Sequence, residues 1–406
     1  MKLFLRNLMS SINLHSSNKE IINSNFLNIC CDDYTEPLIK GGQSKADLAL
    51  HNLDITNYSK LRNNVYPMSK RGSSYLSAYI RHGLIDLKEV WQHVESFKYE
   101  DRSKYQDELL WQEFSRHLYA IVGKKSQKYL NYSINSKTNK NINTQKMNCI
   151  NTIKSELEET GYMVNQTRMW FASHFSIRNH ENWNINENYM FQHLVDGSRF
   201  ANRLGWHWVM GSQTGKVYGF SKFQVQKRAK KLCDECELNF NCPINEWPES
   251  IEITKKNIDV STDIYKNFGP QEIETNNSKP DFVWITAESL GDDDPAMKYF
   301  PNLPVIFIFD QKLLNNLRLS TKRINFLLDC LKEISLKRDL TVLIDDPLDY
   351  LKNKSFASTF APVPKYRKIT KIHKPTYEFP AQRLAQPIEF YPTSFSNWKK
   401  RIKLNI

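Results

Sequence analysis

The chain has 406 residues, of which 40% are hydrophobic and 12% aromatic, and this apolar content excludes a chain that is disordered throughout. Its length fits two domains of ordinary size better than one. The net charge of +12 suits a polyanionic partner such as DNA or RNA, although an A+T-rich genome would produce the same surplus of lysine.

The cysteines indicate a reducing compartment. The chain has seven cysteines, and an odd number in a chain of this size argues against a disulfide scaffold. We therefore expect free thiols at Cys30, Cys31, Cys149, Cys233, Cys236, Cys242 and Cys330. The apolar run at the N-terminus breaks at Arg6, and no stretch reaches the about 18 apolar residues of a membrane span. We therefore expect a cytoplasmic protein without a signal peptide or a membrane helix.

The first 250 residues are predicted to be mainly helical. Residues 11–28 and 131–148 are polar, rich in asparagine and without a hydrophobic period, so we expect loops there. From 46 to 120 and from 149 to 231, apolar residues recur at helical spacing, as in LKEVWQHV and ELLWQEFSRHL.

The spacing of the hydrophobic residues changes in the last third of the chain. Residues 251–279 carry turn formers and are predicted to be a linker. After them come the β-branched runs DFVWITA and PVIFIFD, a long amphipathic stretch and LTVLID, the rhythm of a parallel α/β sheet. The predicted fold is therefore α + α/β: a helical domain over 1–250, a linker, and a small parallel-sheet domain over 280–406.

Two segments, ETGYMVNQTRMWFASHF and ENWNINENYMFQHLVDGSRFANRLGWHW, resemble the FAD-binding core of photolyases and cryptochromes, including the separations between key residues. IKGGQSKADLAL, NYSKLRNN, GSSYLSAYIRHGLIDLKEVW and DELLWQEFSRHL resemble the family's other core motifs, in the right order. The resemblance covers most of residues 38–231. The pieces after residue 280 and the tail EFYPTSFSNWKKRI resemble the family's α/β domain, which normally comes first, so the resemblance implies a circular permutation.

The resemblance implies where FAD binds. Serine hydroxyls and backbone N–H groups in GSSYLSAYI would hold the diphosphate, an Arg–Asp pair would lie over the flavin, and an Asn beside flavin N5 favours repair. The residues concerned are Tyr58, Ser73, Ser74, Leu76, Ser77, Arg168, Asp196 and Asn202. Tyr75 departs from the family's usual Arg, and Ser198 replaces an Asp near the ribose. Outside this context, a serine cluster before a helix is more often only a cap.

The resemblance also implies a substrate pocket and an electron path. Glu108, Trp111, Asn165 and Met169 match residues that line the lesion pocket, where a ring stacks on an extruded base and a carboxyl and an amide read its polar edge. Gln112 and Gln166 stand where many photolyases have Arg, which weakens two contacts. Trp206 and Trp183 match the proximal and middle members of the tryptophan chain, whose third member we do not find. The alternative is that these rings and Glu108 only pack the fold or face solvent.

Three cysteines in the spacing Cys233-x2-Cys236-x5-Cys242, followed by Pro243, come directly after this core. Cys149 lies where iron-sulfur photolyases and cryptochromes of bacteria have their first ligand. The resemblance therefore implies a 4Fe-4S cluster on these four thiolates, with zinc or no metal as the alternatives. Cys30, Cys31 and Cys330 are expected to be small buried apolar groups.

Together these matches imply a monomeric, blue-light-driven lyase that splits pyrimidine dimers in DNA by electron transfer from reduced FAD. A cryptochrome-like light or redox sensor without repair activity is the alternative, and a light-independent nucleic-acid binder is a third. The sequence contains no G-x-G-x-x-G or Walker motif, so a nucleotide enzyme of the common kinds is not indicated. The type of lesion and any antenna pigment remain open.

Overall fold

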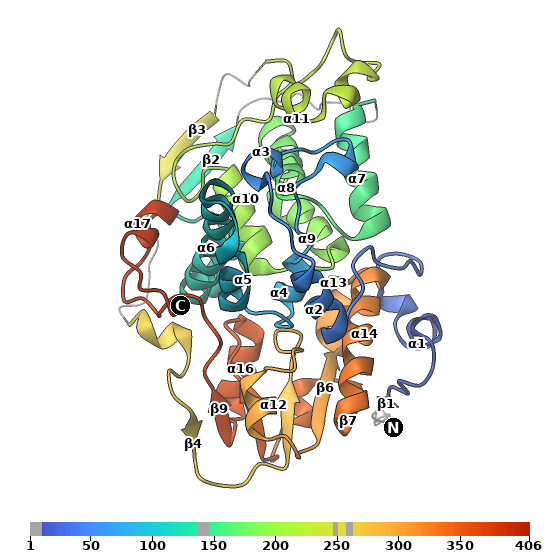
Figure 1. The fold of residues 1–406 in the computed structure, drawn as a ribbon, viewed down its shortest axis with the longest axis vertical. Helices are drawn as coiled ribbons and strands as arrows, with labels where there is room; N and C mark the ends of the chain where they lie inside the picture. The colour runs from blue at the N-terminus through green and yellow to red at the C-terminus, as the bar shows by residue number, and fades with distance from the viewer. Residues whose placement is uncertain (1–9, 137–145, 247–250, 257–262) are drawn as a thin grey trace, which may run out of the picture.

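The structure is a computed structural model that describes residues 10–136, 146–246, 251–256 and 263–406 (Figure 1). Its upper part is helical, and its lower part is a mixed sheet with helices on both faces, which confirms the α + α/β fold class. Among the helices in the described ranges, none combines the length and the apolar content needed to cross a bilayer.

The helical part is built around α6, a 24-residue helix over Tyr99–Val122 that has Glu100 and Asp101 in its first turn and Gly123 as its C-terminal cap. Acidic residues in the first turn stabilise the N-terminal end of a helix. α7 (Asn148–Thr160) is capped by Gly161, whose positive φ of 70° is the left-handed conformation that a helix C-terminus favours. The other helices of this part are α2 (Gln43–His51), α3 (Tyr58–Leu61), α4 (Ser77–Arg81), α5 (Leu87–His93), α7 (Asn148–Thr160), α8 (Asn165–Ser173), α9 (Trp183–His193), α10 (Leu204–Val209) and α11 (Lys222–Asp234). Single π-helical turns over His174–Arg178 and Arg199–Arg203 follow α8 and precede α10.

The sheet has the strand order β1-β7-β6-β5-β8-β9-β4. Its five central strands are parallel: β5 (Phe282–Ile285), β6 (Val305–Asp310), β7 (Leu340–Asp345), β8 (Phe356–Thr359) and β9 (Tyr377–Phe379). β1 (Ser10–Ser11) and β4 (Glu274–Thr275) close the two edges in antiparallel pairs. Every residue of β5 and β6 is buried, as expected for parallel strands that are covered on both faces. The covering and connecting helices are α1 (Asn18–Asn25), α12 (Pro295–Tyr299), α13 (Gln311–Leu317), α14 (Thr321–Lys337), α15 (Pro347–Tyr350), α16 (Pro364–Ile372) and α17 (Phe395–Lys399).

One apolar core runs through both parts. Along β5, Val283 and Ile285 join this main core, whereas Phe282 and Trp284 point to a smaller core on the other face of the sheet. This alternation follows from the two-residue period of a strand. The two parts are therefore packed as one body, and the proposed division into domains stays a prediction.

Two expectations about local structure were wrong. Residues 18–25 form α1 instead of a loop, begun by a capping box between Ser17 and Glu20 and packed on α14. Residues 132–136 form β2, which pairs in antiparallel register with β3 (Ile251–Lys255) inside the expected linker. Within the same expected loop, residues 137–145 lie outside the described residues.

Candidate functional site

A cavity of about 380 Å³ opens in the helical part between α6, α8, α10 and the segment before α4. Most of the residues that we assigned to cofactor or substrate line it: Tyr58, Ser73, Ser74, Ser77, Glu108, Trp111, Asn165, Arg168, Met169, Asp196, Asn202 and Trp206. Leu76 and Trp183 do not, because both lie in the core next to it. One cavity therefore brings together residues from six separate segments.

The serines line one side of the cavity. Tyr75 has a positive φ of 57°, so the chain turns sharply between Ser74 and the start of α4. Ser73 Oγ shares a hydrogen bond with the Tyr162 hydroxyl, whose ring centroid lies 4.8 Å from that of Tyr75. Ser77 Oγ is buried without a protein partner. A buried hydroxyl without a partner is costly, so this side is suited to a polar ligand group.

Arg168 and Asp196 meet in the cavity wall. Arg168 Nη2 lies 2.8 Å from Asp196 Oδ2, and Arg168 Nε donates to the Met163 carbonyl oxygen at 2.9 Å. Asp196 Oδ1 is buried and has no partner. The pair leaves one carboxylate oxygen to accept a hydrogen bond from a ligand.

Asn202 is oriented by the backbone. Its Oδ1 accepts from the Ser198 N–H at 2.6 Å, and Ser198 Oγ in turn accepts from the Ala201 N–H at 3.1 Å. Because the oxygen already accepts this bond, the NH2 group of Asn202 is the donor that the side chain can offer to a ligand in the cavity.

Glu108 forms an ion pair with Arg62, and both side chains are about one-third exposed at 30%. Burial raises the pKa of the Glu108 carboxyl, an effect that exceeds the opposing influence of Arg62. Sequence reasoning missed Arg62. A signal existed, because Arg62 follows Tyr58 by four residues and such residues share a helical face.

Trp111 follows Glu108 on α6 and contacts aromatic rings from two other segments. Its ring centroid lies 6.5 Å from that of Trp208, nearly perpendicular, and 4.0 Å from that of Phe395, in a parallel stack. Asn165 is exposed at the cavity, whereas the neighbouring Gln166 is buried and donates to the Tyr218 hydroxyl at 2.6 Å. Gln112 lines the cavity and Gln166 does not.

The two predicted relay tryptophans are buried. Trp206 lines the cavity, and its Nε1 has no hydrogen-bond partner. The Trp183 ring lies 4.8 Å from that of His207, the residue after Trp206, and 6.3 Å from that of Tyr129. Tyr129 is half-buried, so Trp183 contacts a ring that is partly exposed to solvent. Sequence reasoning did not identify Tyr129.

The four cysteines of the predicted cluster line one small pocket between α7 and α11, beyond the cavity. Cys149 comes from α7, Cys233 from the end of α11, and Cys236 and Cys242 from the loop after it. Burial, and next the neighbouring thiols, raise the pKa of Cys149 to about 12 and that of Cys233 to about 11. The structure thus brings the four thiols to one pocket, although among the described residues only Cys31, Asp32 and His193 lie close enough together to share a metal ion as placed.

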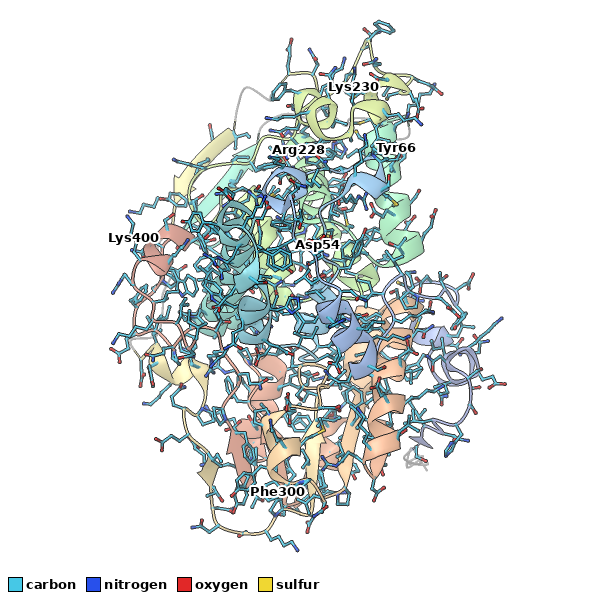
Figure 2. The ribbon with its side chains drawn as sticks, viewed as in Figure 1. Asp54, Tyr66, Arg228, Lys230, Phe300 and Lys400 are labelled. Atoms are coloured by element: carbon cyan, nitrogen blue, oxygen red, sulfur yellow. The ribbon has the colours of Figure 1, made fainter. Side chains whose placement is uncertain are left out.

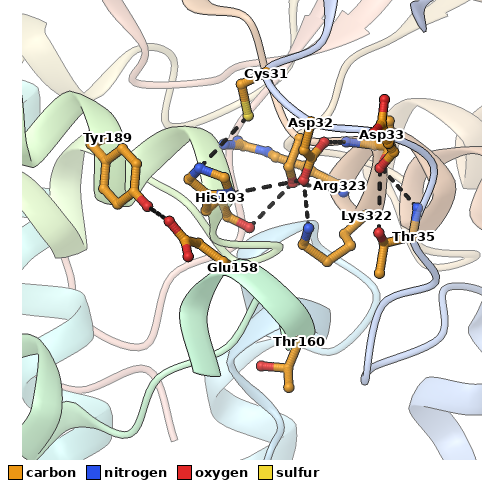
Figure 3. Close-up of polar contacts among 12 residues, drawn as sticks. Cys31, Asp32, Asp33, Thr35, Glu158, Thr160, Tyr189, His193, Lys322 and Arg323 are labelled. Atoms are coloured by element: carbon orange, nitrogen blue, oxygen red, sulfur yellow. Dashed lines mark hydrogen bonds and ion pairs between the residues drawn. The ribbon is translucent and has the colours of Figure 1, made fainter. Parts of the chain in front are cut away.

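A second group, Cys31, Asp32 and His193, lies where α9 meets α14 (Figure 3). Cys31 Sγ lies 3.9 Å from His193 Nε2, whereas Asp32 Oδ2 lies 3.8 Å from Nδ1. The thiol and the carboxylate thus face opposite ring nitrogens. The buried Lys322 ammonium lies 2.5 Å from the same Asp32 oxygen, where a metal cation would bind. The group is better suited to joining the two parts of the molecule than to holding a metal.

This group also corrects an expectation. Cys30 and Cys330 are buried, as expected, but Cys31 is half-buried and faces a histidine ring. It is therefore not a small apolar core group.

Comparisons with known proteins match the helical part of the chain, which contains the cavity. Residues 105–238 match the family model of the FAD binding domain of DNA photolyase. The chain is 30% identical to a deoxyribodipyrimidine photo-lyase of Synechococcus sp. over 39% of its own length and 36% of that protein's. It is 27% identical to the deoxyribodipyrimidine photo-lyase of Vibrio cholerae over 34% of its length and 33% of that protein's. The chain thus spans about a third of the length of the curated relatives it matches.

Two solved structures are also similar. A bacterial class III photolyase from Agrobacterium tumefaciens aligns with a TM-score of 0.37 and 19% identity, over 47% of this chain and 43% of that one. A cryptochrome from Synechocystis sp. aligns with a TM-score of 0.42 and 18% identity, over 48% of this chain and 45% of that one. In its helical part, over residues 105–238, the chain is therefore similar to the FAD binding domain of DNA photolyases.

Proposed function

We propose that this protein is a light-driven DNA photolyase that binds FAD in the helical cavity and splits pyrimidine dimers in DNA. One observation carries the proposal. The residues matched to cofactor and the residues matched to substrate, which come from separate segments of the chain, line a single cavity. A set of helices that only packed a core would leave no such space between them.

The cavity fits FAD by the atoms that it leaves without partners. Ser77 Oγ, Asp196 Oδ1 and Trp206 Nε1 are buried, lack protein partners and line the cavity. Ser73, Ser74 and Ser77 would hold the diphosphate, Arg168 and Asp196 would lie over the flavin, and Asn202 would donate to it. Bound FAD supplies, once reduced and excited by blue light, the electron that splits a dimer and is then returned.

The substrate side of the cavity carries a ring, a carboxyl and an amide. Trp111 would stack on a base of an extruded dimer, while Glu108 and Asn165 bond its polar edge and Met169 fills the remaining gap. Arg62 holds the Glu108 carboxylate in place. Because Glu108 and Trp111 are three residues apart on α6, both can reach one ligand.

A basic helix lies near the cavity. α11 carries Arg228 and Lys230, which Figure 2 shows at the upper end of the molecule, and its Lys227, Lys230 and Lys231 are exposed. Arg228 Nη1 donates to the Asn63 carbonyl oxygen, next to Arg62. Cations in this place suit the phosphates of DNA, whose contacts position a protein on a duplex.

The cysteine pocket supports a second part of the proposal, a 4Fe-4S cluster on Cys149, Cys233, Cys236 and Cys242. Zinc and the absence of a metal remain the alternatives. A centre there would tie α7 to the segment after α11 and so stabilise the wall behind the cavity. Because the cysteines in the described residues form no disulfide, we also propose that the protein works in the cytoplasm.

We further propose that the chain is a circular permutation of the family's order, with domains over 1–250 and 280–406 and a linker over 251–279. The parallel sheet formed by the last third supports this order. Figure 1 places residues 10–25 beside the sheet, so the first segment of the chain crosses back to the second domain.

Photorepair tests the function. Purified, reduced protein would be illuminated with blue light together with oligonucleotides that carry one cyclobutane dimer or one 6-4 lesion, with dark and undamaged samples as controls. We expect light-dependent restoration of one of the two lesions. Protein that holds FAD and binds lesion DNA but repairs neither lesion under illumination would contradict the proposal.

A light or redox sensor without repair activity is the second candidate, and the two glutamines favour it. Gln112 lines the cavity and Gln166 is turned toward Tyr218, where many photolyases have Arg, so two cationic contacts to a lesion are missing. Photoreduction of bound FAD without any affinity for lesion DNA over undamaged DNA would support the sensor.

A further inference from the structure

The C-terminal helix α17 packs against the substrate side of α6 (Figure 1). Phe395, the first residue of α17, stacks on Trp111 with 4.0 Å between ring centroids and 10° between ring planes. It also meets Phe114 edge-on at 5.8 Å. Trp111 and Phe114 are three residues apart, so the helix from the end of the chain covers one face of α6.

Several contacts hold α17 in place. Trp398 is fully buried, and its Nε1 donates to His117 Nδ1 at 3.1 Å. Lys399 forms an ion pair with Asp107, one turn before Trp111 on α6. Upstream, Tyr391 donates its hydroxyl to Asn131 Oδ1 at 3.1 Å. The buried indole and its hydrogen bond anchor the helix, so Phe395 stands on a fixed support.

The stack limits what Trp111 can do. An indole has two faces, and Phe395 occupies one of them. Trp111 nevertheless lines the cavity and Phe395 does not. The part of the ring that remains for a ligand is therefore the part that Phe395 leaves free, and the Trp111 side chain cannot rotate without breaking the stack.

We propose that Phe395 is a positioning residue for substrate recognition, which fixes the indole plane of Trp111 so that its free face receives a planar base of the dimer. The inference rests on the proposed function. A ring that is held in its bound orientation loses little conformational freedom on binding, so preorganisation by Phe395 increases affinity without any contact between Phe395 and the DNA.

The test compares three variants. Phe395→Leu removes the ring and keeps apolar bulk, Phe395→Tyr restores the ring, and Phe390→Leu is the control. Phe390 lies in the same tail, but its ring packs under the Arg401 guanidinium at 3.4 Å. FAD content and melting temperature would be measured for each, so that misfolded protein is recognised.

Two readouts are needed. Affinity for an oligonucleotide with one dimer should fall about tenfold in Phe395→Leu, the size expected for loss of part of one base stack, and should recover in Phe395→Tyr. In protein labelled with 5-fluorotryptophan, the fluorine resonance of Trp111, assigned with Trp111→Phe, should shift and broaden in Phe395→Leu without DNA. Phe390→Leu should match the wild type in both.

Two results would overturn the inference but not the proposed function, and in both the wild-type protein prefers dimer DNA. In the first, Phe395→Leu binds dimer DNA as tightly as the wild type. In the second, Phe395→Leu binds dimer DNA more tightly, which would show that Phe395 occupies the place of the base. If the wild type binds dimer and undamaged DNA alike, the proposed function fails, and the role assigned to Phe395 fails with it.

Discussion

Arg168 Nη2 lies 2.8 Å from Asp196 Oδ2, and the two residues come from α8 and from the turn after α9. The Asp196 side chain is only 5% exposed, so little water screens the pair. Removal of one member of a buried pair leaves an uncompensated charge, which costs more than the pair itself contributes. We therefore expect that neutralising the Asp196 carboxylate alone has a strong effect on FAD content and stability.

We expect Asp196→Asn to lower FAD content and to destabilise the protein by about 3 kcal/mol, because Arg168 loses its counter-charge. Flavin absorbance per chain and urea unfolding measure the two effects. Asp107→Asn is the matched control, since the side chains of Asp107 and Lys399 are 32% and 45% exposed and this pair should contribute less than about 1 kcal/mol. Full flavin occupancy in Asp196→Asn would remove this pair from the cofactor site.

The cysteine pocket predicts a metal content. Anaerobically purified protein should carry about four irons and four sulfides per chain, the content of a 4Fe-4S cluster held by four thiolates. Cys236→Ser should lower the iron content, because it removes one ligand. Cys330→Ser should leave it unchanged, since Cys330 lies on α14, far from the pocket. Stoichiometric zinc in the wild type would decide for the alternative metal.

The buried Trp206 leads to a prediction about the rate at which light reduces bound FAD. Trp206→Phe should slow blue-light reduction of oxidised FAD while FAD stays bound, because phenylalanine is far harder to oxidise than an indole. Trp170→Phe is the control: Trp170 is also fully buried, on α8, but does not line the cavity. Absorbance spectra recorded after timed periods of illumination measure the rate of FAD reduction. An equal rate in Trp206→Phe and Trp170→Phe would show that electrons enter by another route.

The residues that we assigned from motifs with local spacing mostly line one cavity, and the roles assigned to them stay predictions. The sequence shows less of the structure that depends on distant contacts. It did not predict α1, whose buried residues are only Ile21 and Ile22, too few for a clear period. That helix depends on its capping box and on α14, which is distant in the chain. β2 was missed for the same reason, since its partner β3 lies more than a hundred residues later.

Contacts between distant segments were also beyond prediction. Phe395 on Trp111 and Lys322 on Asp32 join residues from opposite parts of the chain, and neither pair has a spacing that can be recognised. Such contacts arise when the sheet part of the molecule packs on the helical part. They follow from the tertiary arrangement and not from local propensity.

Buried His207 predicts a loss of stability in acid. Its Nε2 donates to the Ser126 carbonyl oxygen at 2.8 Å, and burial lowers its pKa from 6.5 to about 4. The unfolded chain therefore binds a proton more readily, so stability that is fully present above about pH 6.5 is lost as the pH falls toward 4. At pH 5 the loss from this residue alone is on the order of 2 kcal/mol. Urea unfolding at pH 7 and pH 5 should show a smaller difference in His207→Gln than in the wild type. An unchanged difference would show that His207 does not contribute.

Glu108 and Trp111, three residues apart on α6 and in the wall of one cavity, separate repair from sensing. If the protein repairs DNA, Glu108→Ala should weaken lesion binding by about 1–3 kcal/mol, through one lost hydrogen bond and an Arg62 left without its carboxylate. Trp111→Ala should cost about 1–3 kcal/mol through lost stacking. Neither change should alter the flavin spectrum. Glu100→Ala, which changes an exposed residue at the start of the same helix, is the control. Thermal stability, measured beside affinity for dimer DNA, distinguishes recognition from packing, because a packing role predicts that stability and FAD are lost together. A stable double variant with intact repair would show that this side of the cavity does not read the lesion.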